Sequence, residues 1–249
     1  MASRRSWRIP ALILSLVATV FLAASVPASA EGRGPSDDSR ASVSLDAASS
    51  AIPTVAQPLV TDSANARSVL QGSGRKAVAT AVATSGCGGC SGTATTLQTV
   101  SVQPGGAAIA DNVATAWSSC ASCSSSAISV QIVTGPSVST VQVNNRSLAL
   151  NAGCSACTTT AVALQFVVVG GTQRELTATT KSIIQQIEHD LGVKLTSPAA
   201  QKAAASMGPS ARREAAQHDA DDAAARAKSA ISSDLRPAQV GVRVEVQAG

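Results

Sequence analysis

Apolar and polar positions alternate with a period of two through the middle of the chain. After the second and third of three Cys-x-x-Cys motifs, one row of alternate positions is apolar, as in Ile128, Val130 and Ile132, and after the first motif the same row is Thr95, Leu97 and Thr99. The row between them carries a glutamine, and β-branched residues are frequent in both rows. Such alternation is typical of strands with one buried face. Turn signals such as Gly135-Pro136 follow, so each motif is predicted to open a strand that ends at a turn.

These strands belong to an internal repeat. Successive motifs are offset by 33 and then 34 residues, and a glutamine stands eight positions after the second cysteine of each motif. The motifs are Cys87/Cys90, Cys120/Cys123 and Cys154/Cys157, and the glutamines are Gln98, Gln131 and Gln165. A repeat of this length predicts a recurring unit of two strands with a cysteine corner. The glutamines could form a hydrogen-bonded ladder between stacked strands or a polar row on a wet face, and both hypotheses stay open.

The period becomes helical from Leu176. Ile184, Ile187 and Leu191 share one helix face, and Ala-rich segments follow around Gly208-Pro209. Alternation returns at the C-terminus. The predicted segments are a signal peptide at 1–30, a flexible leader at 31–75, a β-repeat domain at 76–173, a helical segment at 174–236 and a C-terminal strand at 237–249.

The predicted fold class is therefore mainly β, built from tandem two-strand repeats with cysteine corners and followed by a helical C-terminal segment. Short turns rich in glycine and proline favour antiparallel pairing, so an antiparallel meander or sandwich is the first expectation. A β-solenoid is the alternative.

The first thirty residues resemble a secretory signal. Arg4, Arg5 and Arg8 precede the largely apolar run from Ala11 to Ala24, and Ala28-Ser29-Ala30 is a small-x-small cleavage site. The run is shorter than the roughly 18–20 residues that span a bilayer. We expect a secreted protein, extracellular or loosely associated with the cell surface, with no transmembrane segment after signal cleavage. Export by the general or the twin-arginine route stays open.

Composition and charge exclude some functions. The net charge of +4 includes Arg4, Arg5 and Arg8, so the rest of the chain is close to neutral, and aromatic residues make up 2% of the sequence. A nucleic-acid partner is not expected, because the chain lacks both a basic surface and stacking aromatics. Catalytic motifs for zinc proteases and serine hydrolases are missing, and His189 and His218 fit exposed helix faces. No catalytic or cofactor-binding residue is predicted.

The cysteines have three competing interpretations, and disulfide bonds come first. Export places the chain where such bonds persist, and six cysteines are an even number. Stacked repeats would form columns of three cysteines, which cannot be fully paired within a column, whereas pairing inside each motif uses all six. The favoured bonds are Cys87–Cys90, Cys120–Cys123 and Cys154–Cys157. Disulfide bonds between motifs stay open as an alternative. Closing a four-residue loop stabilises the folded state by about 2 kcal/mol, whereas closing a loop of about 34 residues stabilises it by nearly 4 kcal/mol.

The second interpretation is a zinc site, since two motifs would supply four thiolates, with ligands drawn from the same six cysteines. The third is redox catalysis, which needs a thiol of lowered pKa beside a cation, and Arg146 is the only cation close in sequence. The predicted function is a secreted noncatalytic structural or interaction protein, disulfide-stabilised and of unknown partner, with a cell-surface or other secreted protein as the candidate. The alternatives are an exported cysteine-thiolate zinc-binding protein and a thiol–disulfide oxidoreductase.

The third repeat carries a resemblance to a known group. The stretches from Asn145 to Cys157 and from Ala161 to Val169, followed by Leu176-Thr177, are similar to uncharacterised secreted proteins of actinobacteria with tandem Cys-x-x-Cys units. The resemblance covers about residues 77–192. Some of that group carry the label "peptide zinc metalloprotease", for which this sequence lacks the ligands. The resemblance implies domain boundaries and implies no activity.

Overall fold

The structure is a computed structural model that describes residues 46–71, 75–104, 106–137, 141–170 and 175–249. The strands in this part of the chain are β1 (Asp46–Ala51), β2 (Leu59–Leu70), β3 (Arg75–Ser85), β4 (Ser91–Val102), β5 (Ala108–Ser118), β6 (Ser124–Gly135), β7 (Val141–Asn151), β8 (Thr158–Val169) and β9 (Gln239–Ala248). The helices are α1 (Ala178–Thr196), α2 (Pro198–Ala205) and α3 (Pro209–Leu235).

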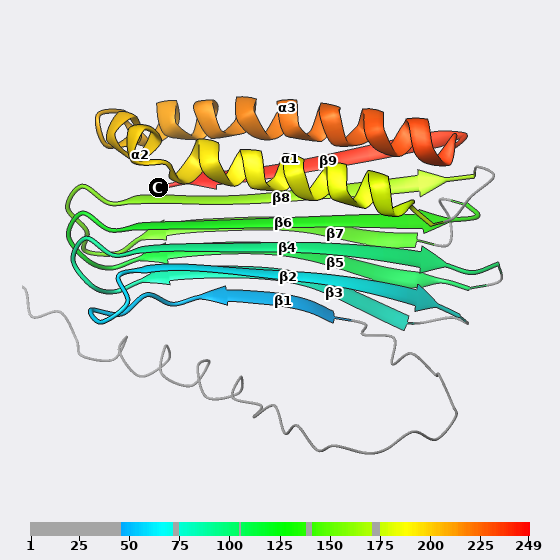
Figure 1. Cartoon of the computed structure of the whole chain (residues 1–249), viewed down its shortest axis with the longest axis horizontal. Helices are drawn as coiled ribbons and strands as arrows, with labels where there is room; N and C mark the ends of the chain where they lie inside the picture. The colour runs from blue at the N-terminus through cyan, green and yellow to red at the C-terminus, as the bar shows by residue number, and fades with distance from the viewer. Residues whose placement is uncertain (1–45, 72–74, 105, 138–140, 171–174) are drawn as a thin grey trace, which may run out of the picture. The chain divides into compact units, whose positions relative to one another are not determined.

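The strands form a two-sheet β-solenoid (Figure 1). One sheet, here the odd sheet, has the order β1-β3-β5-β7, and the other, the even sheet, has the order β2-β4-β6-β8-β9. Neighbouring strands are parallel except β9, which pairs antiparallel with β8. Each coil of the chain adds one strand to each sheet. The register follows the sequence repeat, so that Gln98 pairs with Gln131 and Gln131 with Gln165.

The mainly β class, the repeated strands with cysteine corners and the helical C-terminal segment are confirmed. The antiparallel arrangement is wrong, and the solenoid alternative is the one that the structure has. The reason is that each short turn carries the chain to the opposite sheet. A strand therefore meets its sheet neighbour only after a full coil, when it runs in the same direction again.

The prediction of a flexible leader over residues 31–75 is wrong for residues 46–51 and 59–70, which form β1 and β2. These strands add a first coil that has no cysteine pair. Their Ala and Ser residues, which favoured a flexible segment, instead fill a narrow interior: Ala47, Ser49 and Ala51 are all buried. The signal peptide expected at 1–30 and the leader up to residue 45 lie outside the described residues.

Small side chains occupy much of the space between the two sheets. One buried cluster consists of alanines only, contributed by both sheets: Ala51, Ala81, Ala83, Ala94, Ala114, Ala116, Ala127, Ala161 and Ala163. Alanine loses no side-chain rotamer freedom on burial, but each one buries little apolar area. The interior therefore depends on regular stacking more than on large side chains.

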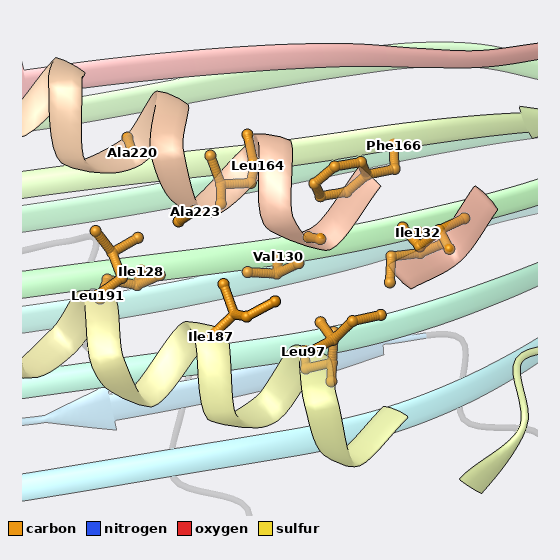
Figure 2. Packing of buried hydrophobic residues seen from close by; sticks show 14 of the residues in the cluster. Leu97, Ile128, Val130, Ile132, Leu164, Phe166, Ile187, Leu191, Ala220 and Ala223 are labelled. Carbon is orange, nitrogen blue, oxygen red and sulfur yellow. The ribbon is translucent and has the colours of Figure 1, made fainter. Parts of the chain in front are cut away.

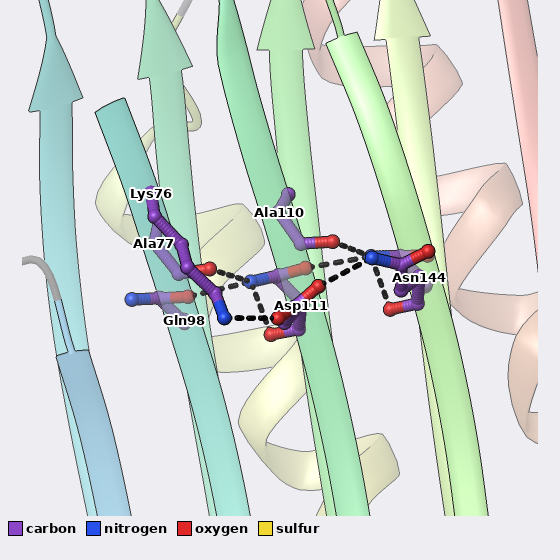
Figure 3. A network of polar contacts seen from close by, with 8 residues as sticks. Lys76, Ala77, Gln98, Ala110, Asp111 and Asn144 are labelled. Carbon is purple, nitrogen blue, oxygen red and sulfur yellow. Dashed lines mark hydrogen bonds and ion pairs between the residues drawn. The ribbon is translucent and has the colours of Figure 1, made fainter. Parts of the chain in front are cut away.

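A ladder of fully buried glutamines crosses this interior. Gln131 Nε2 donates to Gln98 Oε1 at 2.7 Å, and Gln165 Nε2 donates to Gln131 Oε1 at 2.7 Å. Gln131 and Gln165 also donate to backbone carbonyls of the odd sheet, at Asp111 and Ala110 respectively, each at 3.0 Å (Figure 3). The ladder hypothesis is therefore correct and the wet-face hypothesis wrong. Because the amides bond to both sheets, they satisfy polar groups that would otherwise be buried without partners.

A second, shorter ladder lies beside the first. Asn112 Nδ2 donates to Asn145 Oδ1 at 2.8 Å, and Ser129 Oγ donates to Asn112 Oδ1 at 2.6 Å. Asn112 is fully buried. This ladder is not among the features predicted from the sequence, although the two asparagines stand 33 residues apart, the length of one repeat.

One buried carboxylate lies in β5 near the glutamine ladder. Asp111 accepts a hydrogen bond from Asn144 Nδ2 at 2.6 Å and pairs with Lys76 Nζ at 2.6 Å (Figure 3). Burial by itself raises the pKa of Asp111, but the contacts with Lys76 and Asn144 outweigh it and hold that pKa below its ordinary value. The ionised carboxylate thus fastens β5 to β3 and β7.

Helices α1 and α3 cover the outer face of the even sheet. The outward row of that sheet, which includes Leu97, Val130 and Leu164, packs with Ile187 of α1 and Ala220 of α3 in one buried cluster (Figure 2). Fully burying one such large apolar side chain contributes about 1.5–3 kcal/mol. The principal large-residue core thus lies between the helices and the sheet.

Glu188 is buried on α1 in this helix–sheet layer. The residue is 7% exposed, and its Oε1 has no hydrogen-bond partner in the part of the chain that the structure describes. Burial raises the pKa of Glu188 to about 8, against 4.5 for a free glutamate. The folded protein therefore binds this proton more tightly than the unfolded chain does.

The free energy of unfolding should accordingly fall as pH rises from 4.5 to about 8, because the buried carboxyl must then ionise. We expect Glu188→Gln to remove this loss, so that the variant exceeds the wild type by up to about 5 kcal/mol above pH 8 and matches it near pH 4. Urea denaturation across this pH range measures both proteins. Glu214→Gln, on an exposed site of α3, is the control and should follow the wild type. A wild-type unfolding free energy that is flat between pH 5 and 8 would contradict this assignment.

Candidate functional site: a column of disulfide corners

The three Cys-x-x-Cys motifs lie at the same end of the solenoid, where the even-sheet strands begin (Figure 1). Each motif carries the chain from an odd-sheet strand to the next even-sheet strand. Backbone hydrogen bonds continue the parallel ladder through this column, from Ser124 N to Cys90 O at 2.9 Å and from Thr158 N to Cys123 O at 3.0 Å. The corners are thus stacked in the same register as the strands.

Disulfide bonds join the cysteines within each motif, which is the pairing that the sequence analysis favoured. The bonds are Cys87–Cys90, Cys120–Cys123 and Cys154–Cys157, with Cα–Cα distances of 5.4, 5.8 and 5.7 Å. These distances are usual for disulfides. All six cysteines are described, and none of them is free.

A left-handed residue precedes the second cysteine in every corner. Gly89 has φ 72°, Ser122 has φ 52° and Ala156 has φ 54°. In an extended strand, residues three apart point to opposite faces, so a bend is needed before the two sulfurs can meet. The positive φ provides that bend. Glycine adopts it readily, whereas serine and alanine do so at a cost of about 1–2 kcal/mol.

Sulfur atoms of the second and third corners are in contact. Cys123 Sγ lies 3.4 Å from Cys157 Sγ, and the Sγ atoms of Cys123, Cys154 and Cys157 all lie within 4.8 Å of one another. Cys123 and Cys157 are buried, and Cys154 is half-buried. Of the six candidate metal ligands, the structure thus brings three together, and the first corner is not part of this group.

A cation that the sequence analysis missed lies at the third corner. Arg212, in the first turn of α3, donates from Nη1 to the Cys157 carbonyl oxygen at 3.1 Å. Its Nε is buried and has no hydrogen-bond partner among the described residues. Arg146, the cation near the motif in sequence, instead lies in the middle of β7 with its side chain exposed. No local signal could have indicated Arg212, because 55 residues separate it from Cys157.

In the part of the chain that the structure describes, the two histidines do not join a cluster of metal-ligand type. His189 and His218 are exposed on α1 and α3, and the cysteine group above is the one cluster of metal-ligand type in the described ranges. Among the helices that the structure describes, none combines the length and the apolar character needed to cross a bilayer.

No protein-family model, curated protein or solved structure matches this chain. The resemblance to secreted actinobacterial proteins therefore stays a prediction.

Substitutions at the corner residues test the left-handed geometry. A Cβ added at Gly89 would meet no atom within 4 Å, so Gly89→Ala should act through its backbone alone and lower the unfolding free energy by about 1 kcal/mol. Ala156→Gly should raise it by about 0.5–1 kcal/mol, because the left-handed penalty exceeds the entropy cost of glycine. Chemical denaturation measures both variants. Gly88→Ala is the matched control and should change little, since its φ is not left-handed and its Cβ would make only an ordinary contact. Shifts of the same sign at Gly89 and Ala156 would contradict the geometry.

Proposed function

We propose that the protein is a secreted, noncatalytic structural or interaction module in which disulfide bonds fasten a stack of parallel coils. The observation that carries this proposal is the column of three disulfides, one at each of three consecutive corners. Their repetition with the strands favours an architectural role, because a single active site would need only one reactive pair. The structure of each coil depends on its neighbours, as in other solenoids.

The composition of the interior supports this role. The space between the sheets holds hydrogen-bonded amides, a cluster of alanines and a smaller cluster that includes Leu70, Val100 and Val133. Closing each four-residue loop adds about 2 kcal/mol in the chain-entropy model. Three such loops would stabilise an architecture in which much of the apolar area between the two sheets comes from alanine.

Export is part of the proposal. Disulfides persist outside the reducing cytosol, and the features of residues 1–30 fit a secretory signal. We expect the protein to be extracellular or loosely associated with the cell surface, and its partner to be a cell-surface or other secreted protein.

Two other functions have an observation in their favour. Three sulfurs from two corners lie within 4.8 Å of one another, so the reduced second and third motifs could supply thiolates to zinc. The guanidinium of Arg212 at the third corner would favour a thiolate there, as a thiol–disulfide oxidoreductase requires. Both need reduced cysteines, whereas the noncatalytic role needs bonded ones.

The redox state of the purified protein separates these functions. The full chain should be expressed with its own N-terminus, collected from the medium without reductant, and measured for free thiols, bound metal and linked peptides. We expect no free thiol, no bound zinc and three bonds within the motifs. Zinc near one equivalent with protected thiols would instead support the metal-binding protein. A pair that small dithiols reduce and reoxidise readily would support the oxidoreductase.

A further inference from the structure

The contact between the second and third corners has chemical consequences. Cys123 Sγ and Cys157 Sγ belong to different disulfides, yet they lie 3.4 Å apart, which is a contact distance for two sulfur atoms. Cys154 Sγ lies within 4.8 Å of both. A thiolate that attacks a neighbouring disulfide needs such access to one of its sulfurs.

We propose that the second and third disulfides exchange with each other, with Cys157 as the attacking sulfur. Once the Cys154–Cys157 bond opens, the Cys157 thiolate attacks Cys123 Sγ. A Cys123–Cys157 bond forms, the Cys120–Cys123 bond breaks, and Cys120 leaves as a thiolate. This inference rests on the proposed function, because the bonds must be present in the mature protein.

The opening step requires an external dithiol as the reductant. Its thiolate attacks the half-buried Cys154, which releases Cys157 as a thiolate, and its second thiol then displaces Cys154. The dithiol is oxidised to a disulfide and two electrons pass to the third corner. The later exchange transfers no further electrons from outside. Attack by Cys154 on Cys157 of the new bond restores Cys154–Cys157 and releases Cys123, so that the reduced pair becomes Cys120/Cys123.

Burial and charge select Cys157 for this role. The residue is 4% exposed, so a bulky reductant reaches Cys154 more easily than Cys157. Burial alone would disfavour a thiolate, but the Arg212 guanidinium lies against the backbone of Cys157, and a nearby cation favours the ionised sulfur. The first corner has no such arrangement, because Cys87 and Cys90 are outside the sulfur cluster.

A single substitution tests the exchange without added reductant. In Cys154→Ser, Cys157 is left as one free thiol beside the Cys120–Cys123 bond. We expect Cys157 to attack Cys123 in part of the molecules, so that the free thiol lies on Cys157 in some of them and on Cys120 in the others. Alkylation after acid quenching should then label both Cys120 and Cys157, and a linked Cys123–Cys157 peptide should appear. Cys87→Ser is the matched control. In this variant the alkylating reagent should label Cys90 alone, and the other two disulfide bonds should stay intact. Label on Cys157 alone, with Cys120–Cys123 intact, would overturn the proposal.

The wild-type protein gives a second measurement that does not depend on the folding of a variant. Less than one equivalent of a dithiol is added, and samples are quenched and alkylated over time. Label should appear at Cys154 and Cys157 first and at Cys120 later, with a transient Cys123–Cys157 link. Label that stays on the third corner would overturn the exchange and leave the proposed function standing. Label at all six cysteines before any dithiol is added would overturn the proposed function itself.

Discussion

The structure depends on the in-register stacking of equivalent positions from successive coils. Parallel pairing places Gln98, Gln131 and Gln165 in one column, where their amides bond to each other and to the opposite sheet. A slip of one residue would turn every side chain of a strand to the other face. The glutamines would then face the apolar layer under the helices. The row of large apolar side chains that includes Val130 would point into the space between the sheets, which alanines fill at this level. The ladder and the narrow core therefore fix the same register.

The chemistry of the corners follows from that register. Because equivalent cysteines stack, sulfurs from motifs that are 34 residues apart in sequence lie in contact. The left-handed residue in each motif closes the bond within one corner, while stacking brings the next corner close enough to exchange with it. The same geometry thus gives covalent fastening in the oxidised protein and a cluster of thiols in the reduced one. The redox state of the compartment determines whether the corners hold disulfide bonds or free thiols.

Much of the β-repeat fold could be predicted from the sequence, because the same pattern of residues occurs three times. The strands, the corners and the row of glutamines recur at a fixed spacing. Strand direction could not be deduced from the turns, since a short turn serves equally well for a hairpin or for a crossing to the opposite sheet. The first coil was missed because residues 46–70 contain no cysteine and have Ala66 at the position that pairs with Gln98. Arg212 and Glu188 owe their environments to helix packing, which no repeat reveals.

Removing one whole coil tests the stacking most directly. Ser91 and Ser124 are register partners, so deletion of residues 91–123 takes out one repeat and leaves every remaining column aligned. Deletion of residues 92–123 removes one residue fewer and shifts the register of all later strands. Circular dichroism and urea denaturation compare the two proteins. The account predicts a β-rich spectrum and cooperative unfolding for the first deletion and an unfolded chain for the second. Equal stability of the two proteins, or folding of the second alone, would contradict it.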